Sequence, residues 1–317
     1  MKFLITGANG FVGRLLCEEL RLRGQSVRAA VRSARQDEGI DKIEVGNIDG
    51  ETDWLEALQG VDVVIHLAAR VHVMKEAATD PLAEFLKVNL QGTKNLAEQA
   101  AAAGIKRLVY VSSIKVNGEK TSVMHPFTEA DDPKPQDPYG ISKRRAEQAL
   151  QIISQETGLE VVIVRPPLVY GPGVKGNFIS LMSAIDNGMP LPLAGAHNLR
   201  SLIYAGNLVD ALVACATHAA AAGQTYLVRD GEDVSTAQLV EKIAKALERK
   251  CHSFYFPPRL VSAAAALLGR SEQVVRLFGS LRVSDAKIRR ELGWAAPYTL
   301  EQGLRATADW YRSQAIY

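Results

Sequence analysis

Three glycines stand between a predicted strand and a predicted helix near the start of the chain. Phe3–Thr6 is a short apolar run with β-forming residues, and apolar residues recur at helical spacing over residues 11–22. Between these segments, Gly7, Gly10 and Gly13 form a G-x-x-G-x-x-G pattern. Glycine lets the backbone turn sharply and approach a ligand closely, and the helix N-terminus then presents free N–H groups to an anion. The pattern therefore predicts a site for the pyrophosphate of a dinucleotide cofactor.

The size and charge of the chain restrict the classes of protein to which it can belong. It has 317 residues, of which 47% are hydrophobic, enough for one large α/β domain with a smaller one appended. The formal net charge of +2 gives no reason to expect nucleic acid or an anionic membrane as the main partner.

The cysteines and the apolar segments indicate where the protein works. Cys17, Cys215 and Cys251 lie far apart and form no C-x-x-C pair, which suits a reducing compartment and argues against zinc. The six histidines show no metal-ligand spacing, so no metal site is expected. No secretory signal is visible, and the apolar stretch Leu260–Leu268 is too short to span a bilayer and is predicted to be a buried helix. These features predict a cytoplasmic protein without membrane insertion.

Strands and helices are predicted to alternate through the first half of the chain. Near-continuous apolar runs separated by helical patterns indicate parallel strands that helices cover on both faces. The fold class expected is α/β, a Rossmann doubly wound parallel sheet with a smaller mixed α/β domain at the C-terminal side. The predicted strands are Val27–Val31, Val61–Leu67, Leu108–Val111 and Val161–Val164, and the predicted helices include Pro81–Ala103, Ser142–Ser154, Leu208–Ala221, Ala237–Leu247 and Leu300–Tyr311.

This alternation breaks after Arg165, where a passage rich in proline and glycine begins. We place the boundary between the two domains near residue 170. Residues 1–170 are expected to form the dinucleotide-binding domain, and residues 171–317 mainly a domain that closes over the substrate.

A tyrosine and a lysine four residues apart form a candidate acid–base pair. Asp137 is predicted to cap a helix that begins at Pro138, so Tyr139 and Lys143 share one helix face. We expect the lysine ammonium to lower the pKa of the phenol, so that the tyrosine exchanges a proton near neutral pH. Ser112-Ser113 follows a predicted strand at the sheet edge where parallel sheets bind ligands.

Several motifs in order carry a resemblance to a known family. They are Gly7-x-x-Gly10-x-x-Gly13, His66-Leu-Ala-Ala69, Ser112-Ser113, Tyr139-x-x-x-Lys143 and Arg165-Pro-Pro-Leu-Val-Tyr-Gly-Pro172. Together they resemble the extended short-chain dehydrogenase/reductase family, in its nucleotide-sugar epimerase/dehydratase branch, over nearly the whole chain. The resemblance implies that Ser113, Tyr139 and Lys143 are the catalytic residues, with Lys143 also holding the nicotinamide ribose and Asn89 supporting the lysine.

The same resemblance implies which residues bind the cofactor and the nucleotide-sugar substrate. Arg282 and Arg289 are weaker candidates for the substrate. The substrate-binding residues implied are Ser113, Asn177, Phe178 and Arg200. The cofactor-binding residues implied are Gly7, Gly10, Phe11, Val12, Gly13, Arg32, Arg35, Asn47, Ile48, Leu67, Ala68, Ala69, Asn89, Tyr139, Lys143 and Pro166.

Two departures from the family pattern narrow the expected activity. The sugar 4,6-dehydratases carry an acidic pair directly after the catalytic Ser/Thr, and here Ile114 and Lys115 stand in those places. Dehydration needs a proton donor and a base there, so this activity is not expected. Leu168 replaces an asparagine that many epimerases carry, so one diphosphate contact would be lost or moved.

The end of the second predicted strand bears on the choice of cofactor. NAD-preferring proteins of this fold place an acidic residue there to hold the ribose 2′-hydroxyl, whereas an arginine accommodates a 2′-phosphate. This chain offers no acid but two arginines, Arg32 and Arg35. We therefore favour NADP(H) as the cofactor, with NAD(H) as the alternative.

Three functions are compatible with these residues. The first is an NADPH-dependent 4-ketoreductase of a UDP-4-keto-6-deoxy-hexosamine, which resembles UDP-N-acetylquinovosamine-forming enzymes in the segments Arg276–Leu281 and Leu292–Trp294. The second is a 4-epimerase of a UDP-hexose or UDP-N-acetylhexosamine that retains NAD. The third is a non-catalytic dinucleotide sensor, and Tyr139→Phe would separate it from the enzymes. A homodimer through the helices at residues 81–103 and 142–154 is a further expectation.

Overall fold

The structure is a computed structural model that describes residues 1–33, 41–71, 79–257 and 277–314. Among these residues, no helix is both long enough and apolar enough to cross a membrane. The predicted buried helix at Leu260–Leu268 lies outside the described residues.

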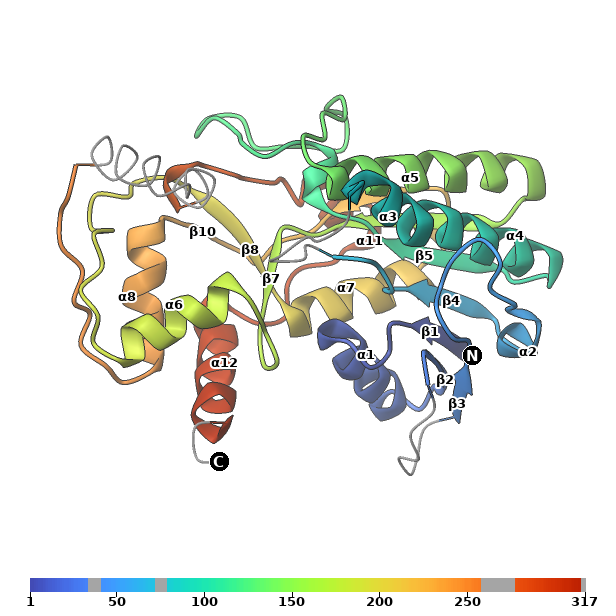
Figure 1. Cartoon of the computed structure of the whole chain (residues 1–317), viewed down its shortest axis with the longest axis horizontal. Helices are drawn as coiled ribbons and strands as arrows, with labels where there is room; N and C mark the ends of the chain where they lie inside the picture. The colour runs from blue at the N-terminus through green and yellow to red at the C-terminus, as the bar shows by residue number, and fades with distance from the viewer. Residues whose placement is uncertain (34–40, 72–78, 258–276, 315–317) are drawn as a thin grey trace.

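A seven-stranded parallel sheet forms the larger part of the molecule, in the order β3-β2-β1-β4-β5-β6-β9 (Figure 1). All neighbouring strands run parallel, and Ile5 of β1 lies between Ala29 of β2 and Ile65 of β4. The central strands are buried along their length, which explains their continuous apolar sequences. The strands are β1 (Lys2–Thr6), β2 (Ser26–Val31), β3 (Asp41–Glu44), β4 (Val63–His66), β5 (Arg107–Val111), β6 (Glu160–Arg165) and β9 (Thr225–Leu227).

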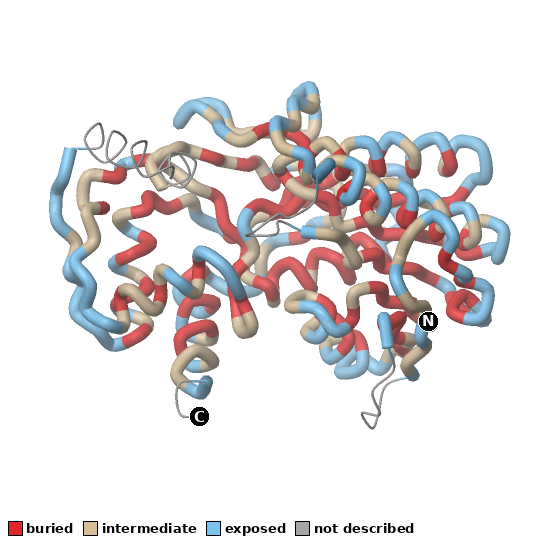
Figure 2. Tube along the Cα trace, viewed as in Figure 1, coloured by how far each residue is buried: buried red, intermediate tan, exposed pale blue. Residues whose placement is uncertain are grey.

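Helices cover both faces of this sheet, and Figure 2 shows the buried strands between them. Side chains alternate along each strand, so Ile5 packs on one face while its neighbour Leu4 packs on the other. One face is covered by α1 (Phe11–Leu22), α7 (Ala205–Thr217) and α11 (Ala286–Leu292). The other is covered by α2 (Leu55–Leu58), α4 (Thr93–Ala102) and α5 (Pro138–Thr157), with α3 (Pro81–Leu86) beside α5. The predicted α/β class with a doubly wound Rossmann sheet is confirmed.

A smaller part lies beyond the carboxyl edge of the sheet, on the left of Figure 1. Its three strands have the order β10-β8-β7, and its core gathers Tyr170, Phe178, Val240 and Leu304. The elements are β7 (Leu168–Tyr170), β8 (Arg200–Tyr204), β10 (Asp233–Val234), α6 (Asn177–Asp186), α8 (Thr236–Ala246) and α12 (Leu300–Gln314). The described residues also form two short 3₁₀ helices, η2 (Ile114–Val116) and η3 (Ala219–Ala221).

The chain leaves the large sheet after β6 and later returns to it. Strand β9 pairs with β6, and α7 covers the sheet, although both lie beyond residue 170. The division into residues 1–170 and 171–317 therefore stays a prediction about which residues bind the cofactor and which bind the substrate. It does not coincide with a division of the fold, since the large sheet takes residues from both ranges.

The helix predicted over residues 81–103 is present but not uniform. Between α3 and α4, the segment η1 (Lys87–Gly92) is a π-helix, which widens the turn. A Cβ on Gly92 would lie 2.7 Å from the Ile48 side chain, so the helix passes close to the loop after β3 at this point. The π-turn carries Asn89, which is fully buried.

Candidate active site

The glycine turn between β1 and α1 has the shape expected for a phosphate cradle. Gly7 adopts a φ of +69°, which favours glycine, and a Cβ on Gly13 would lie 2.2 Å from the Gly7 carbonyl oxygen. The first helical hydrogen bond runs from the Arg14 N–H to the Gly10 carbonyl at 3.1 Å. The N–H groups that precede it, those of Phe11, Val12 and Gly13, therefore stand at the open end of the helix. This packing of backbone on backbone fits a dinucleotide pyrophosphate.

A buried side-chain relay holds the neighbouring loop at residues 67–69. The Ala68 N–H donates to Thr6 Oγ1 at 3.1 Å, and this hydroxyl lies 2.6 Å from His66 Nδ1. His66 Nε2 lies 2.9 Å from Thr93 Oγ1. Burial lowers the pKa of His66 to about 3, so the ring is neutral and joins two hydroxyls. A neutral ring carries one N–H, so one ring nitrogen donates to its threonine hydroxyl and the other accepts from the second hydroxyl.

The residues implied for the adenosine half lie at the carboxyl ends of β2 and β3. Arg32 follows the last residue of β2 and is exposed, whereas Arg35 lies outside the described residues. Asn47 is exposed and its carbonyl accepts from Thr52 Oγ1 at 3.0 Å, while the half-buried Ile48 packs on the core. Arg32 is therefore accessible to solvent or to a ligand near the glycine turn.

Ser113 and Tyr139 come together from two different elements. Ser113 follows β5 and caps η2 by accepting from the Lys115 N–H at 3.3 Å. Tyr139 is the second residue of α5, whose start is fixed by Asp137 accepting from the Gly140 N–H at 2.7 Å, as the sequence predicts. The Ser113 hydroxyl lowers the pKa of Tyr139 and so favours the phenolate. A hydroxyl and a phenol placed in this way can polarise and protonate the same oxygen of a substrate.

Lys143 lies one turn after Tyr139 in the interior. Its ammonium donates to the Val111 carbonyl at 2.8 Å and lies 4.5 Å from the centroid of the Tyr110 ring. The centroid of the Tyr139 ring is farther, at 5.9 Å. Burial lowers the pKa of Lys143 to about 7, although the nearby Glu147 carboxylate raises it. Lys143 is thus shared between the end of β5 and the two tyrosine rings.

The predicted lowering of the Tyr139 pKa by Lys143 is wrong in this structure. The pKa of Tyr139 is raised to about 12, mainly by burial and also by the Asp137 carboxylate, while the Ser113 hydroxyl acts to lower it. The reason is geometric, since the Lys143 ammonium is directed at Val111 and Tyr110 instead of the phenol.

Asn89 has a different role from the implied support of Lys143. Within the described residues, its amide donates to Ser142 Oγ at 2.9 Å and to the Arg70 carbonyl at 3.0 Å. Its carbonyl oxygen accepts from the Arg70 N–H at 2.8 Å. Asn89 therefore fixes the end of the 67–70 loop to α5, and it acts on the lysine only through the neighbouring residue.

A buried ionic network lies behind these residues. Arg165 on β6 pairs with Glu147 on α5, and the Ser112 hydroxyl donates to the same carboxylate at 2.6 Å. The third guanidinium nitrogen of Arg165, Nη1, donates to Asn117 Oδ1 at 2.9 Å. The adjacent Pro166 carbonyl accepts from the Ile114 N–H at 3.0 Å. Glu147 and Asn117 belong to none of the sequence motifs named above, and the only sequence signal for Glu147 is its position one turn beyond Lys143.

The residues implied for the substrate lie in the smaller part. Asn177 is exposed at the start of α6, whereas Phe178 is buried and stacks on Tyr170 with ring centroids 5.4 Å apart. A contact from Phe178 would therefore come from its backbone N–H. Arg200 begins β8 and donates to the Gly279 carbonyl at 3.1 Å.

The two weaker candidates are held by carboxylates. Arg282 bonds to Asp233 at 2.7 Å, and Arg289 is paired with Asp285 through its Nε. Across the described ranges, no group of three or more His, Cys, Asp and Glu side chains is arranged to hold a metal ion.

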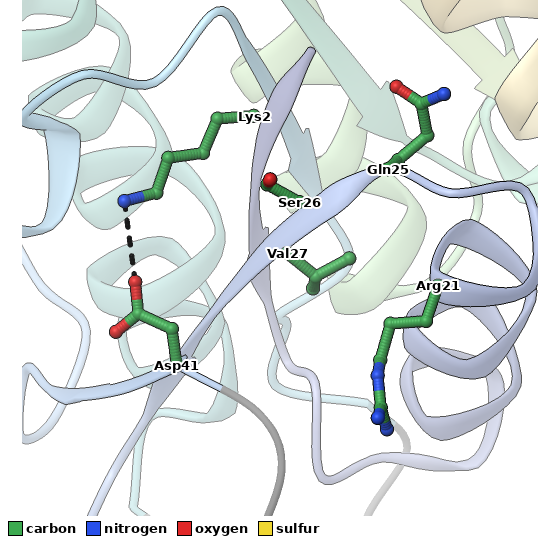
Figure 3. Close-up of a pocket in the computed structure, with 6 residues that line it drawn as sticks. All are labelled: Lys2, Arg21, Gln25, Ser26, Val27 and Asp41. Atoms are coloured by element: carbon green, nitrogen blue, oxygen red, sulfur yellow. Dashed lines mark ion pairs between the residues drawn. The ribbon is translucent and has the colours of Figure 1, made fainter.

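A surface hollow of about 390 Å³ lies at the opposite edge of the sheet (Figure 3). Lys2 and Ser26 begin β1 and β2 there, and the Lys2 ammonium lies 3.3 Å from Asp41. Because the glycine turn follows the other end of β1, this hollow is separate from the candidate active site.

Known proteins resemble this chain over nearly its full length. A UDP-glucose 4-epimerase of Vibrio cholerae is 44% identical over 309 residues, which cover 96% of this chain and 94% of that protein. The structure of MoeE5 in complex with UDP-glucuronic acid and NAD is 28% identical, with a TM-score of 0.79, and covers 99% of this chain and 100% of that one. The UDP-glucose 4-epimerase of Thermus thermophilus in complex with NAD is 25% identical, with a TM-score of 0.79, and covers 98% and 99%.

The family assignment combines these similarities with the site. Residues 3–228 match the NAD dependent epimerase/dehydratase family, a segment that runs from β1 to just beyond β9. It contains the glycine turn, Ser113, Tyr139 and Lys143. The chain belongs to the NAD-dependent epimerase/dehydratase family of enzymes.

Proposed function

We propose that this enzyme is a 4-epimerase of a UDP-hexose, with UDP-glucose and UDP-galactose as the first substrates to test. The observation that carries the proposal is the 44% identity, along almost the whole of both chains, to a protein named UDP-glucose 4-epimerase. The relatives thus support the epimerase hypothesis better than the 4-ketoreductase, which is the first expectation from the sequence.

In the proposed reaction, Tyr139 exchanges the proton of the sugar 4-hydroxyl. A nicotinamide dinucleotide, held by the glycine turn and Lys143, would supply the hydride-transfer chemistry at C4. Tyr139 would remove the hydroxyl proton as C4 is oxidised to the 4-keto level, and it would give the proton back to the same oxygen as C4 is reduced on its other face. Ser113 donates to the same oxygen and polarises the carbonyl. The balance is an inversion at C4 with no net oxidation.

The role of Lys143 in this reaction is to bind the cofactor. Its ammonium is buried beside the end of β5, where it donates to the Val111 carbonyl and lies near the two tyrosine rings. Together with the N–H groups of the glycine turn, Lys143 would hold the cofactor through its ribose.

We propose that the smaller part holds the UDP group. The Arg200 guanidinium, which the Gly279 carbonyl steadies, suits a diphosphate because its fork can donate two hydrogen bonds. Asn177 and the backbone N–H of Phe178 stand at the start of α6 and would contribute further donors. Residues 171–317 would mainly serve this purpose, while residues 1–170 hold the cofactor.

We propose NAD as the cofactor, because both related structures above were solved with NAD. The exposed Arg32 after β2 is the observation that still favours NADP(H). It also keeps the 4-ketoreductase as the second candidate function, since that reaction consumes NADPH.

The cofactor content of the purified protein tests this choice. The epimerase proposal predicts tightly retained NAD and no preference for NADPH in a binding titration. Protein without cofactor that binds NADPH much more tightly than NADH would favour the ketoreductase, and Arg32→Asp should then reverse the preference. The non-catalytic sensor remains the third candidate, and it predicts that Tyr139→Phe leaves the biological activity unchanged.

The predicted homodimer is a separate proposal. Helix α5 exposes Ile152 over 53% of its surface, and α3, α4 and α5 lie on one side of the sheet, so a second copy of these helices could complete a four-helix contact. Light scattering of the purified protein measures the mass directly, and a monomer at micromolar concentration would contradict this proposal.

A further inference from the structure

Lys115 connects the two elements that carry Ser113 and Tyr139. Its backbone N–H donates to Ser113 Oγ, and its ammonium bonds to Asp137 Oδ2 at the start of α5. Its carbonyl lies so close to α5 that a Cβ on Gly140 would be 2.9 Å from it. One residue of η2 therefore contacts both the serine side of the site and the helix start on the tyrosine side.

The two carboxylate oxygens of Asp137 bind different groups. One carboxylate oxygen accepts from the Gly140 N–H at 2.7 Å and caps α5, and the other binds Lys115. The carboxylate also lies near Tyr139, two residues farther along, and raises the pKa of that phenol. A cap of this kind opposes formation of the phenolate unless its charge is balanced.

The other charges around Tyr139 are already engaged. Lys143 donates to Val111, and Glu147, one turn later, is paired with Arg165. On the side of α3, the Phe85 ring packs edge-on against Tyr139 and lies 5.6 Å from the Arg70 guanidinium, with Glu84 4.0 Å from that guanidinium. Tyr110, from β5, is a neutral phenol whose pKa is raised by burial and by Tyr139. The ion pair of Lys115 and Asp137 is thus the pair whose charge a substitution can change beside the phenol. Glu119 also lies 3.1 Å from the Lys115 ammonium.

We propose that Lys115 is a positioning residue for Tyr139. The Lys115 ammonium orients the Asp137 carboxylate at the start of α5 and balances the charge of this carboxylate beside the phenol. The proposal rests on the assignment of Tyr139 as the proton-exchanging group. It gives a use to the residue that stands where the dehydratases carry an acid.

The test compares four variants by the pH at which Tyr139 ionises in the NAD-loaded protein. Lys115→Met leaves the Asp137 charge unbalanced, so the midpoint should rise by roughly half to one pH unit. Asp137→Asn keeps a capping side chain but removes the charge, so the midpoint should fall. Lys115→Arg keeps the charge and should change little. Lys242→Met is the matched control, because Lys242 also contacts two carboxylates, Glu232 and Glu301, and has a similar side-chain exposure, 26% against 23%.

Two readouts keep this proposal separate from the proposed function. The first is the rising limb of kcat against pH with UDP-glucose, where Lys115→Met should lower the rate roughly threefold to tenfold below the midpoint. The second is tyrosinate absorbance, with Tyr139→Phe subtracted, which needs no turnover. Shifts of opposite sign for Lys115→Met and Asp137→Asn in either readout would support the proposal. An unchanged midpoint in both variants, or an equal shift in Lys242→Met, would overturn it. If Lys115→Met does not fold, the other two variants decide the question. The proposal then requires that the midpoint falls in Asp137→Asn and stays unchanged in Lys115→Arg.

Discussion

Arg165 and Glu147 form a doubly hydrogen-bonded ion pair in the interior, with Nε to Oε1 at 2.8 Å and Nη2 to Oε2 at 2.6 Å. Their side chains are only 5% and 0% exposed. The pair joins β6 to α5 one turn beyond Lys143. The position of the catalytic helix against the sheet therefore depends on two charges that the solvent does not screen.

Breaking this pair should destabilise the protein strongly. Glu147→Gln leaves a buried guanidinium without its counter-charge, so the free energy of unfolding should fall by about 3–5 kcal/mol. Urea denaturation measures the change. The control is Glu98→Gln in the exposed Lys94–Glu98 pair, which should cost less than about 1 kcal/mol. Equal effects of the two substitutions would contradict the importance of the buried pair.

Removing the phenolic hydroxyl should abolish proton exchange without disturbing the fold. Tyr139→Phe should lower kcat by about 10²–10⁴-fold, while cofactor retention and the melting temperature stay close to those of the parent. Ser113→Ala should lower kcat less, because the phenol remains. Steady-state kinetics with UDP-glucose check both values. A Tyr139→Phe protein with more than a tenth of the parental kcat would refute the assigned role.

Lys143 should make stability depend on pH in a defined window. Its pKa is about 7 in the folded protein against 10.5 as the ordinary value, so the unfolded chain binds the extra proton between these pH values. The contribution of Lys143 to the free energy of unfolding is therefore lowest below pH 7. It rises with pH between pH 7 and 10.5, by up to about 1.4 kcal/mol per pH unit. Lys143→Met should remove this slope from urea titrations of cofactor-free protein, whereas Lys242→Met should keep it. Parallel curves for the parent and Lys143→Met would be the contrary result.

The glycine turn should not tolerate a methyl group at Gly13. Its Cβ would lie 2.2 Å from the Gly7 carbonyl, so Gly13→Ala must push α1 away from the turn. We expect at least a tenfold loss of cofactor affinity, since the helix N-terminus moves with α1. Gly231→Ala is the matched control, because a Cβ there meets no atom within 4 Å. Isothermal titration with NAD measures both, and an unchanged affinity in Gly13→Ala would argue against the cradle.

Much of this fold could be predicted from local patterns. The apolar runs at β4, β5 and β6 are continuous because both faces of these strands are covered. Asp137 and Pro138 correctly predict where α5 begins. The return of the chain to the large sheet at β9 could not be read in this way. Periodicity shows which face of an element is buried but not which strand it joins.

The chemistry of the site was less predictable than its composition. Tyr139 and Lys143 share a helix face as expected. The pKa of Tyr139 is nevertheless raised, because the phenol is buried and the Lys143 ammonium donates to the Val111 carbonyl instead. Asn89 was implied as a support for the lysine, whereas its partners are Ser142 and the backbone of Arg70. These contacts join segments distant in sequence, so they follow from the packing and not from spacing.

The most direct measurement incubates the purified protein with UDP-glucose, without added reductant, and follows the sugar nucleotides by chromatography. The account predicts that UDP-galactose accumulates to an equilibrium mixture, that the same mixture forms from UDP-galactose, and that Tyr139→Phe forms neither. Failure to interconvert either UDP-hexoses or UDP-N-acetylhexosamines, together with stoichiometric NADPH consumption on a UDP-4-keto-6-deoxy-hexosamine, would contradict it.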